Sequence, residues 1–255
     1  MPPATPTPPA TVDLNADVGE GEDDRQLLGL VTTVHVACGF HAGDPGVMHR
    51  TVSAAVAAGA VVGAHPSYPD SDGFGRRPMD RTPAQVAADL LYQVGALDGV
   101  ARACGTRVRS VKPHGALYHR MAADEDCAWA VAEAVAAYGE GLALVAPAGS
   151  VAADVARRHG VPVVAEGFCD RGYLPDGTLA PRASAGALVT DPDEAGRRAV
   201  SLAVSGRLVA VDGTELALRC DTLCVHGDTP GAAALAAAVR RALEEAGVAL
   251  AAFSG

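Results

Sequence analysis

Short segments rich in Val and Ala alternate along the chain with longer segments in which apolar residues recur every three to four positions. The first pattern predicts buried strands, and the second predicts helices with one apolar face. Because a helix separates each strand from the next, we expect one parallel sheet covered by helices. Strands are expected at residues 11–15, 32–37, 60–64, 108–111, 142–145, 161–165 and 222–225.

The expected helices carry recognisable start signals. Asp44, Thr82 and Asp191 are each followed by Pro, which is the arrangement of an N-cap residue with Pro at the first helical position. Residues 208–216 predict a small hairpin around an Asp-Gly turn, and the stretch 167–190 is expected to be irregular. Helices are expected at residues 44–58, 82–104, 125–138, 150–159, 191–205 and 230–246.

The chain has no linker or break in composition after its Pro-rich first ten residues. We therefore expect a disordered arm at 1–10 and a single (β/α) barrel domain of about seven strands at 11–255. A doubly wound open sheet is the alternative. The sequence contains neither a GxGxxG pattern after the first strand nor a GxxxxGK[ST] pattern, so these nucleotide-binding motifs are missing.

Composition narrows the classes of partner. The 255 residues carry a net charge of −10, and such a field repels nucleic acid and anionic lipid, so neither is an expected partner. No apolar run reaches the roughly 18 residues of a membrane span, and the chain start lacks the features of a signal peptide. The six cysteines form no CxxC pair, which favours reduced thiols in the cytoplasm.

Polar residues gather where the expected strands end. The carboxyl ends of parallel strands meet at one face of the fold, so side chains that are distant in sequence are expected to form one site there. Lys112 and Asn15 stand out further because they are the only Lys and the only Asn in the chain. The polar residues in these positions are Asp13, Asn15, Asp17, Glu20, His41, Asp44, His65, Lys112, His114, Glu166, Asp170, His226 and Asp228.

Several of these residues have a structural explanation as well. Asp44 is equally well explained as a helix N-cap, and Asp170 and Asp228 as residues that organise turns. His35 alternates with apolar residues inside a strand, so we expect a hydrogen-bonded core histidine. Cys38 is expected to be a small buried residue because no base lies next to it in sequence.

A set of imidazoles and carboxylates without a serine elbow favours hydrolysis by activated water. In one version, Asp17, His41 and His65 hold a divalent metal ion, although no close-spaced metal signature supports them. In the other version, side chains act as general acid and base, and Lys112 stabilises negative charge on an oxyanion or phosphate.

Six blocks of the sequence resemble the signature blocks of the LamB/YcsF family, which contains the A subunit of the prokaryotic 5-oxoprolinase. The resemblance runs in order from about residue 11 to 250. It implies an irregular (β/α) barrel related to the glycoside hydrolase/deacetylase superfamily. The blocks are VDLNADVGEG (12–21), ACGFHAGDP (37–45), GAHPSYPDSDGFGRRPM (63–79), VKPHGALY (111–118), DRGYLPDGTLAPR (170–182) and CVHGDTPGA (224–232).

The resemblance implies ATP-dependent opening of 5-oxo-L-proline (pyroglutamate) to L-glutamate, with Mg²⁺ and with separate B and C subunits as partners. In this chemistry Lys112 would contact the oxyanion or phosphate, and His114 or His65 would act as base. Asp17, Glu20 and Asp228 would hold Mg²⁺ or polar substrate atoms. The candidate catalytic residues are Lys112, His114, His65, His41, Glu166 and Asp17, and the candidate substrate-binding residues are Asn15, Arg76, Asp170, Arg171, His226 and Asp228.

Two other functions stay open at this point. One is an ATP-independent, metal-dependent hydrolase acting on an amide or an acetylated sugar. The other is a non-catalytic role in substrate binding or as a scaffold, against which the density of titratable groups on one face argues. Because the chain has no P-loop, ATP could bind through loop amides here or on a partner subunit.

Overall fold

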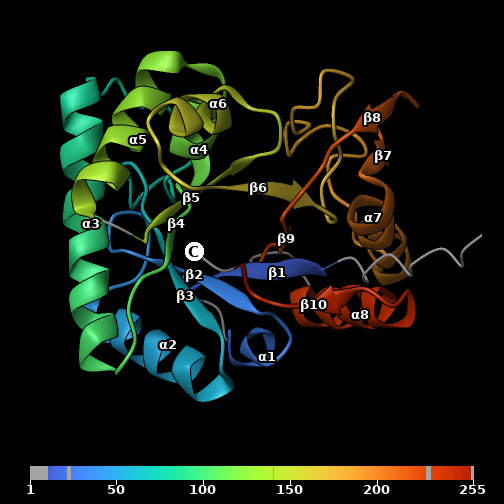
Figure 1. Ribbon diagram of the computed structural model, residues 1–255, viewed down its shortest axis with the longest axis horizontal. Helices are drawn as coiled ribbons and strands as arrows, with labels where there is room; N and C mark the ends of the chain where they lie inside the picture. Colours follow the sequence, from blue (N-terminus) through green and yellow to red (C-terminus); the bar gives the residue numbers. More distant parts are fainter. Residues whose placement is uncertain (1–10, 22–23, 140, 228–230, 254–255) are drawn as a thin grey trace, which may run out of the picture.

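The computed structural model describes residues 11–21, 24–139, 141–227 and 231–253; the segment 1–10 and Asp228 lie outside the described residues. Its centre is a closed barrel of parallel strands (Figure 1). The first barrel strand pairs with the last, with Asp13 opposite Thr222, which confirms the expected barrel and excludes an open doubly wound sheet. The barrel strands are β1 (Thr11–Val18), β2 (Thr33–Ala37), β3 (Val61–His65), β4 (Ser110–Val111), β5 (Ala143–Pro147), β6 (Val163–Phe168) and β9 (Thr222–Val225).

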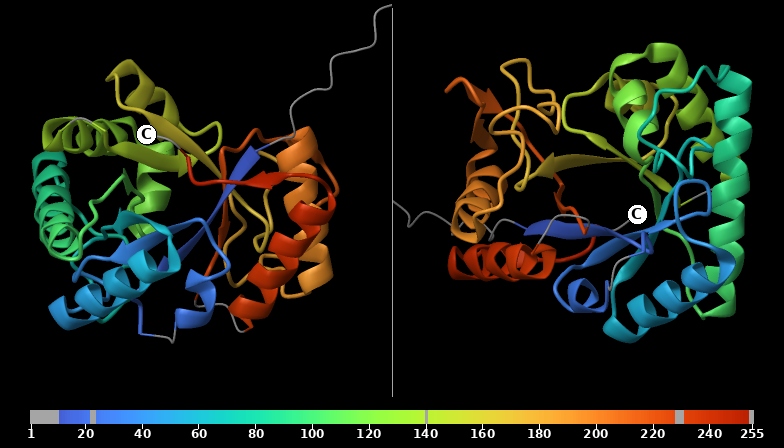
Figure 2. Two further views of the ribbon diagram at one scale, coloured as in Figure 1. Left: turned by 60° about the horizontal axis from the view of Figure 1, so that its bottom comes forward. Right: turned by 180° about the vertical axis from the view of Figure 1, so that it is seen from behind.

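Helices cover the barrel on its outside. Figure 1 shows α2 to α6 around one side and α7 and α8 on the other, and the views in Figure 2 agree. Helices α7 and α8 pack against each other. The helices are α1 (Arg25–Leu28), α2 (Pro45–Ala58), α3 (Pro83–Ala103), α4 (Gly115–Ala123), α5 (Glu125–Tyr138), α6 (Val151–Arg158), α7 (Pro192–Ser205) and α8 (Ala232–Glu245).

The predicted helix starts are confirmed by their caps. The Asp44 side chain accepts a hydrogen bond from the backbone N–H of Val47 at 2.7 Å, so the N-cap explanation of this residue holds. Thr82 and Gln85 form a reciprocal capping box at the start of α3, and Asp191 caps α7. In each helix the side-chain oxygen satisfies a backbone donor that the first helical turn leaves without a partner.

The structure differs from the sequence expectation at β1 and α4, and the short elements α1 and β10 (Ala249–Leu250) also have no counterpart among the expected ones. The apolar pattern predicts that strand β1 ends at residue 15, which is wrong because the strand continues to Val18. Asp13, Asn15 and Asp17 alternate along β1 and are all buried, so their polarity reflects a polar barrel interior rather than a loop. Helix α4 has no counterpart among the predicted helices, because its Lys-Pro-His-Gly start resembles a loop.

Two small elements complete the fold. The expected hairpin is confirmed as the antiparallel pair β7 (Arg207–Val209) and β8 (Glu215–Ala217). Strand β10 (Ala249–Leu250) pairs with the beginning of β1, next to the closed ring. The stretch between β6 and α7 contains only isolated bridges, as expected for an irregular segment.

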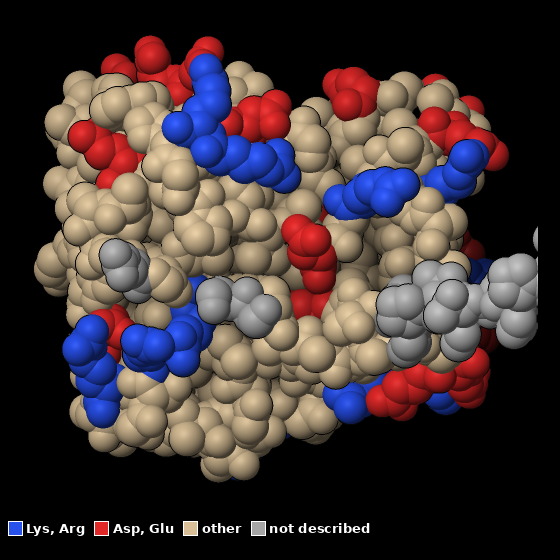
Figure 3. Space-filling view, viewed as in Figure 1, with Lys and Arg blue, Asp and Glu red and all other residues tan. Residues whose placement is uncertain are grey.

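The core is built mainly from Val, Ala and Leu, which matches the low aromatic content of the chain. All six cysteines are free, as expected for thiols. Among the described residues, no helix is both long and apolar enough to cross a membrane. On the face seen in Figure 3, basic and acidic side chains are interspersed, and one acidic group lies near the middle of the face.

Candidate active site

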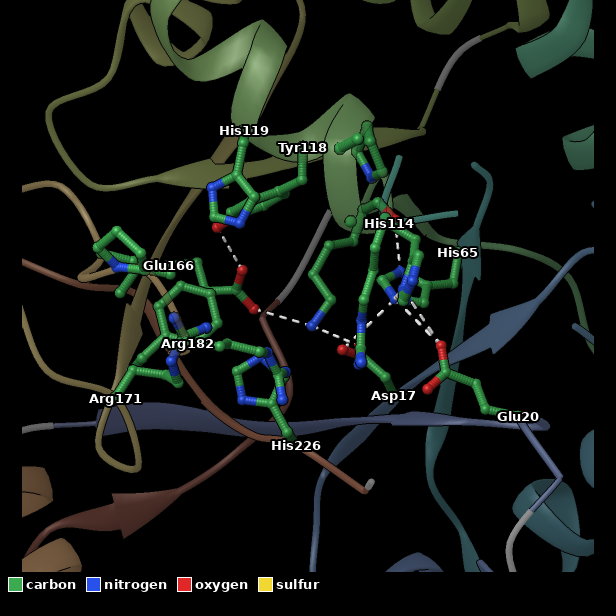
Figure 4. Close-up of a pocket in the computed structure, with 18 of the residues that line it drawn as sticks. Asp17, Glu20, His65, His114, Tyr118, His119, Glu166, Arg171, Arg182 and His226 are labelled. Atoms are coloured by element: carbon green, nitrogen blue, oxygen red, sulfur yellow. Dashed lines mark hydrogen bonds and ion pairs between the residues drawn. The ribbon is translucent and has the colours of Figure 1, made fainter. Parts of the chain in front are cut away.

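A pocket of about 400 Å³ lies at the carboxyl end of the barrel strands (Figure 4). Residues from β1, β3 and β6 and from the segments after β4 and β9 form its wall, so the expected convergence of strand-end side chains is observed. Of the residues predicted from the sequence, the wall contains Asp17, Glu20, His65, Arg76, Lys112, His114, Glu166, Arg171 and His226.

Three predicted residues lie behind this wall and contact it. Asn15 is fully buried and donates from Nδ2 to Glu166 Oε1 at 3.1 Å. His41 stacks on His114, with ring centroids 3.9 Å apart. Asp170 is also buried and accepts hydrogen bonds from His226.

Lys112 occupies the floor of the pocket and is 2% exposed. Its Nζ lies 2.6 Å from Asp17 Oδ1, 2.9 Å from Asn15 Oδ1 and 3.0 Å from Glu166 Oε1. The ammonium donates hydrogen bonds to Asn15, Glu166 and the Cys224 sulfur, the last at 3.4 Å, and its contact with Asp17 is an ion pair. On the far side, Glu166 Oε2 accepts from the Tyr118 hydroxyl at 2.5 Å.

The charges on this floor stabilise one another. Burial alone would lower the pKa of Lys112, but Asp17 and Glu166 raise it well above its ordinary value. Burial would likewise raise the pKa of Asp17, but His65 and Lys112 hold it well below its ordinary value. The geometry therefore keeps a carboxylate and an ammonium ionised in the barrel interior.

Next to this floor, Glu20, His41, His65 and His114 form a compact group that we call the histidine cluster. Glu20 Oε1 lies 2.8 Å from His41 Nε2, 3.2 Å from His114 Nδ1 and 3.7 Å from His65 Nε2. One side-chain atom from each of the four residues falls within 4.8 Å of the others. Figure 4 shows Glu20 beside His65 and His114 at one end of the pocket.

The two pocket-facing histidines have their outer nitrogens fixed by backbone carbonyl groups. His65 Nδ1 lies 2.7 Å from the carbonyl oxygen of Lys112, and His114 Nε2 lies 2.9 Å from that of Phe74. A carbonyl oxygen only accepts, so both of these nitrogens carry a proton. The two remaining nitrogens, His65 Nε2 and His114 Nδ1, face each other at 2.9 Å.

The position of the Phe74 carbonyl depends on a backbone conformation that is rare for a residue other than glycine. Phe74 has φ 55°, which makes it the one non-glycine residue with positive φ in the described ranges. Its neighbour Gly75 also has positive φ, and a Cβ there would lie 2.9 Å from the His114 ring. Local strain of this kind persists where the surroundings enforce it, and here it positions the acceptor for His114.

Another histidine of the pocket is oriented from behind by a carboxylate. His226 Nδ1 lies 2.9 Å from Asp170 Oδ2, and the backbone N–H of His226 donates to the same oxygen at 3.0 Å. Burial would raise the pKa of Asp170, but its contacts with His226 hold it below the ordinary value. With the Nδ1 proton directed at Asp170, the His226 Nε2 atom is left to face the pocket (Figure 4).

Three arginines also line the pocket, and Figure 4 shows Arg171 and Arg182 on the side away from the histidine cluster. Arg171 is 3% exposed and donates to the carbonyl oxygens of Ala180 and Ala187 at 2.7 and 3.2 Å. Its guanidinium therefore organises the irregular segment that carries Arg182. Arg76 is the third arginine of the wall.

His35 and Cys38, which we expected to have structural roles, are both buried in the core. His35 is fully buried, with Nε2 3.1 Å from the Ser110 hydroxyl. Cys38 is also buried, and burial raises the pKa of its thiol to about 12. Sequence reasoning missed Tyr118 and Arg182 as pocket residues, although both lie inside the recognisable blocks at 111–118 and 170–182.

The chain matches the LamB/YcsF family over residues 12–255. The chain belongs to this family. A relative from Streptomyces griseus subsp. griseus, named as the A subunit of 5-oxoprolinase, is 51% identical over 249 residues, covering 95% of this chain and 100% of the relative. A protein of Kocuria rhizophila with the same name is 50% identical over 249 residues, covering 95% and 99%.

A solved structure supports the same assignment. The crystal structure of a lactam utilization protein from Thermus thermophilus superimposes with a TM-score of 0.91 at 48% identity. The match covers 95% of this chain and 100% of the other. The barrel described above is therefore the fold of this relative as well.

Proposed function

We propose that this chain opens the ring of 5-oxo-L-proline to give L-glutamate, coupled to ATP hydrolysis, as the A subunit of a multi-subunit 5-oxoprolinase. The observation that carries the proposal is full-length similarity to proteins named as the A subunit of 5-oxoprolinase, with 50% and 51% identity over 95% or more of both chains. The pocket volume of about 400 Å³ falls within the range of small-molecule sites and supports a substrate of this size.

Ring opening adds water to the lactam carbonyl carbon and breaks its bond to the ring nitrogen, which takes up a proton. An unstrained amide reacts slowly, so phosphorylation of the carbonyl oxygen by ATP would make the carbon electrophilic and supply the driving force. The phosphoryl group then leaves as inorganic phosphate. The site must therefore supply a base for water, positive charge near the oxygen and recognition of anionic groups.

His226 is the best-placed base. Asp170 fixes its Nδ1 proton at 2.9 Å, so the opposite nitrogen can accept a proton from water. Lys112 supports negative charge that develops on the carbonyl oxygen, because its ammonium lines the pocket and is held by hydrogen bonds to Asn15 and Glu166 and by an ion pair with Asp17. These roles differ from the expectation that His114 or His65 is the base.

The arginine side of the pocket suits the anionic groups of the reactants. Arg182 lines this side, whereas Arg76 lies 4.9 Å from the Phe74 ring centroid, next to the histidine cluster. Both guanidinium groups match the carboxylate of the substrate or a phosphate of the nucleotide. Mg²⁺ bound with ATP would neutralise phosphate charge. The sequence has no P-loop, so ATP could bind at these arginines or on a partner subunit. Calorimetric titration of the isolated chain with MgATP separates the two possibilities.

The test is reconstitution with the expected B and C subunits, measuring glutamate and ADP formed from 5-oxoproline while each component is omitted in turn. We expect both products only when all subunits, ATP and Mg²⁺ are present. Glutamate formation without ATP would instead indicate an ATP-independent amide hydrolase.

A pair of matched substitutions tests the role of the site. Asp170→Asn should lower kcat by about a hundredfold or more, because the amide no longer fixes the proton of His226. Asp176→Asn, in an exposed turn of the same segment, should leave kcat unchanged. Full activity of both variants would remove His226 as the base and favour a non-catalytic role for the pocket.

A further inference from the structure

In the histidine cluster, acceptor atoms converge in an arrangement that requires an added positive charge, either a metal ion or a proton on one of the rings. With His65 Nδ1 and His114 Nε2 each donating to a carbonyl, neutral rings direct two nitrogen lone pairs at each other across 2.9 Å. Oxygen lone pairs approach the same two nitrogens. Glu20 Oε1 lies 3.2 Å from His114 Nδ1, and Asp17 Oδ2 lies 3.4 Å from His65 Nε2. Such a convergence of acceptors is stable only with a cation among them.

Burial makes this requirement strict. His41 and His65 are 4% and 2% exposed, so water does not separate the converging acceptors. Lys112 does not supply the cation, because it donates to Asn15 and Glu166, and its ion pair with Asp17 runs to Oδ1 rather than to the Oδ2 that faces His65.

The spacing of the acceptors fits a metal ion. Ligand atoms that are each about 2.1 Å from a common centre lie about 3.0 to 3.4 Å apart in octahedral or tetrahedral coordination. The separations within the cluster are 2.8 Å between His41 and Glu20, 2.9 Å between the two facing histidines, 3.2 Å between His114 and Glu20 and 3.7 Å between His65 and Glu20, so they bracket these values. Small side-chain movements would bring all four atoms to one centre.

The outer contacts of the cluster also resemble those of metal sites. Histidine ligands usually donate their second ring nitrogen to a carbonyl or carboxylate, which fixes the tautomer that binds the metal. The Lys112 and Phe74 carbonyls do this for His65 and His114. The positive φ of Phe74 places one of these carbonyls, so strained backbone serves the geometry of the cluster.

We propose that Glu20, His41, His65 and His114 bind one divalent transition-metal ion, with Asp17 beside it. Three imidazoles and one carboxylate suit Zn²⁺, Co²⁺ or Fe²⁺ and do not suit Mg²⁺, which prefers oxygen ligands. The set keeps His41 and His65 from the sequence expectation, replaces Asp17 by Glu20 and adds His114. The site is independent of the ATP-bound Mg²⁺ discussed above.

The competing explanation is a proton shared between His65 and His114, which would also separate the two lone pairs. The experiment that distinguishes them uses the full chain after treatment with a chelator and removal of the chelator. Titration with Zn²⁺ by calorimetry should give one ion bound per chain, and addition of Co²⁺ should produce a visible absorption band. Mg²⁺ at the same concentration should give neither signal.

Three variants locate the ion. Glu20→Gln keeps the shape of the side chain, and His114→Ala removes a ligand; each should weaken Zn²⁺ binding at least tenfold and diminish the Co²⁺ band. His49→Ala, at an exposed position on α2, is the matched control and should bind as the wild type does. Circular dichroism shows whether each variant is folded. If His114→Ala does not fold, the Zn²⁺ affinity of Glu20→Gln alone tests the proposed site.

Two results would overturn the proposal. One is a wild-type chain that takes up neither Zn²⁺ nor Co²⁺ in a one-to-one ratio, which leaves the shared proton as the explanation. The other is a folded Glu20→Gln variant with wild-type affinity. Neither measurement uses substrate, ATP or partner subunits, so failure here is distinct from failure of the proposed lactam reaction.

Discussion

Two aspartates on strand β1 point into the barrel interior at different heights, in two separate layers of side chains. Asp13 and Asp17 are four residues apart and both buried, yet their partners differ in kind. Asp13 accepts from the hydroxyls of Thr32 and Thr33 at 2.6 Å each, and also from Thr222. We call this set the threonine layer. Asp17 instead contacts the Lys112 ammonium and the His65 ring.

The pKa values of the two carboxyl groups move in opposite directions. Burial raises the pKa of Asp13, because the surrounding hydroxyls only partly replace water. In the pocket layer, burial is outweighed by His65 and Lys112, and the pKa of Asp17 falls. One layer therefore satisfies its polar groups with neutral donors, and the other concentrates charge next to open space. The first arrangement connects β1 with β2 and β9 through hydrogen bonds, and the second suits the catalytic role proposed for the pocket.

The largest expected effect comes from removing the cation of the pocket layer. Lys112→Met should abolish glutamate formation and lower the free energy of unfolding by about 3–5 kcal/mol, because Asp17 and Glu166 lose the charge that compensates them. Urea unfolding and the reconstituted assay measure the two losses.

A second variant sharpens this prediction. Adding Asp17→Asn to Lys112→Met should recover part of the stability, since one uncompensated carboxylate is removed, while activity stays absent. If the double variant is less stable than the wild type by the sum of the costs of Lys112→Met and Asp17→Asn measured singly, the two residues do not interact and the contrast between the layers fails.

The same contrast explains what could be predicted from the sequence. The barrel and its helix caps follow from local patterns, such as the Pro that comes after Asp44 and Thr82, and the structure confirms them. The pocket could be located from the strand ends, because parallel topology brings them together whatever the detailed packing. The pattern assigns part of β1 to a loop, since an inward-facing polar strand lacks the usual apolar run.

The partnerships within the pocket could not be predicted in this way. That Asp17 pairs with Lys112, while Glu20 joins His41, depends on how the segment after β1 folds back, and no spacing encodes it. The carbonyl of Phe74 acts through the backbone and leaves no side-chain signal. The Asp170–His226 pair joins residues 56 positions apart across the ends of two strands.

A matched pair of hydroxyl deletions should give an intermediate effect. Thr33→Val removes one donor to Asp13, and should cost about 1–3 kcal/mol of stability while leaving kcat unchanged. Tyr118→Phe removes one donor to Glu166, and should reduce kcat. Urea unfolding and initial rates on both variants provide the comparison. A loss of activity in Thr33→Val with Tyr118→Phe unaffected would reverse the roles assigned to the two layers.

The smallest expected effect is a change in the pH dependence of stability. Because the pKa of Asp13 is higher in the folded state than the value of 3.8 it has when exposed, its contribution to stability is fully present below about pH 3.8 and is lost as pH rises through the folded pKa. Asp13→Asn cannot ionise, so relative to this variant the wild type should lose stability on going from acidic to neutral pH. The difference between the two unfolding free energies, measured in urea at matched pH values, should therefore shift in favour of Asp13→Asn as pH rises.

A difference that is constant with pH would mean that the hydroxyls of the threonine layer compensate the Asp13 charge completely, and that the two layers differ less than their partners suggest.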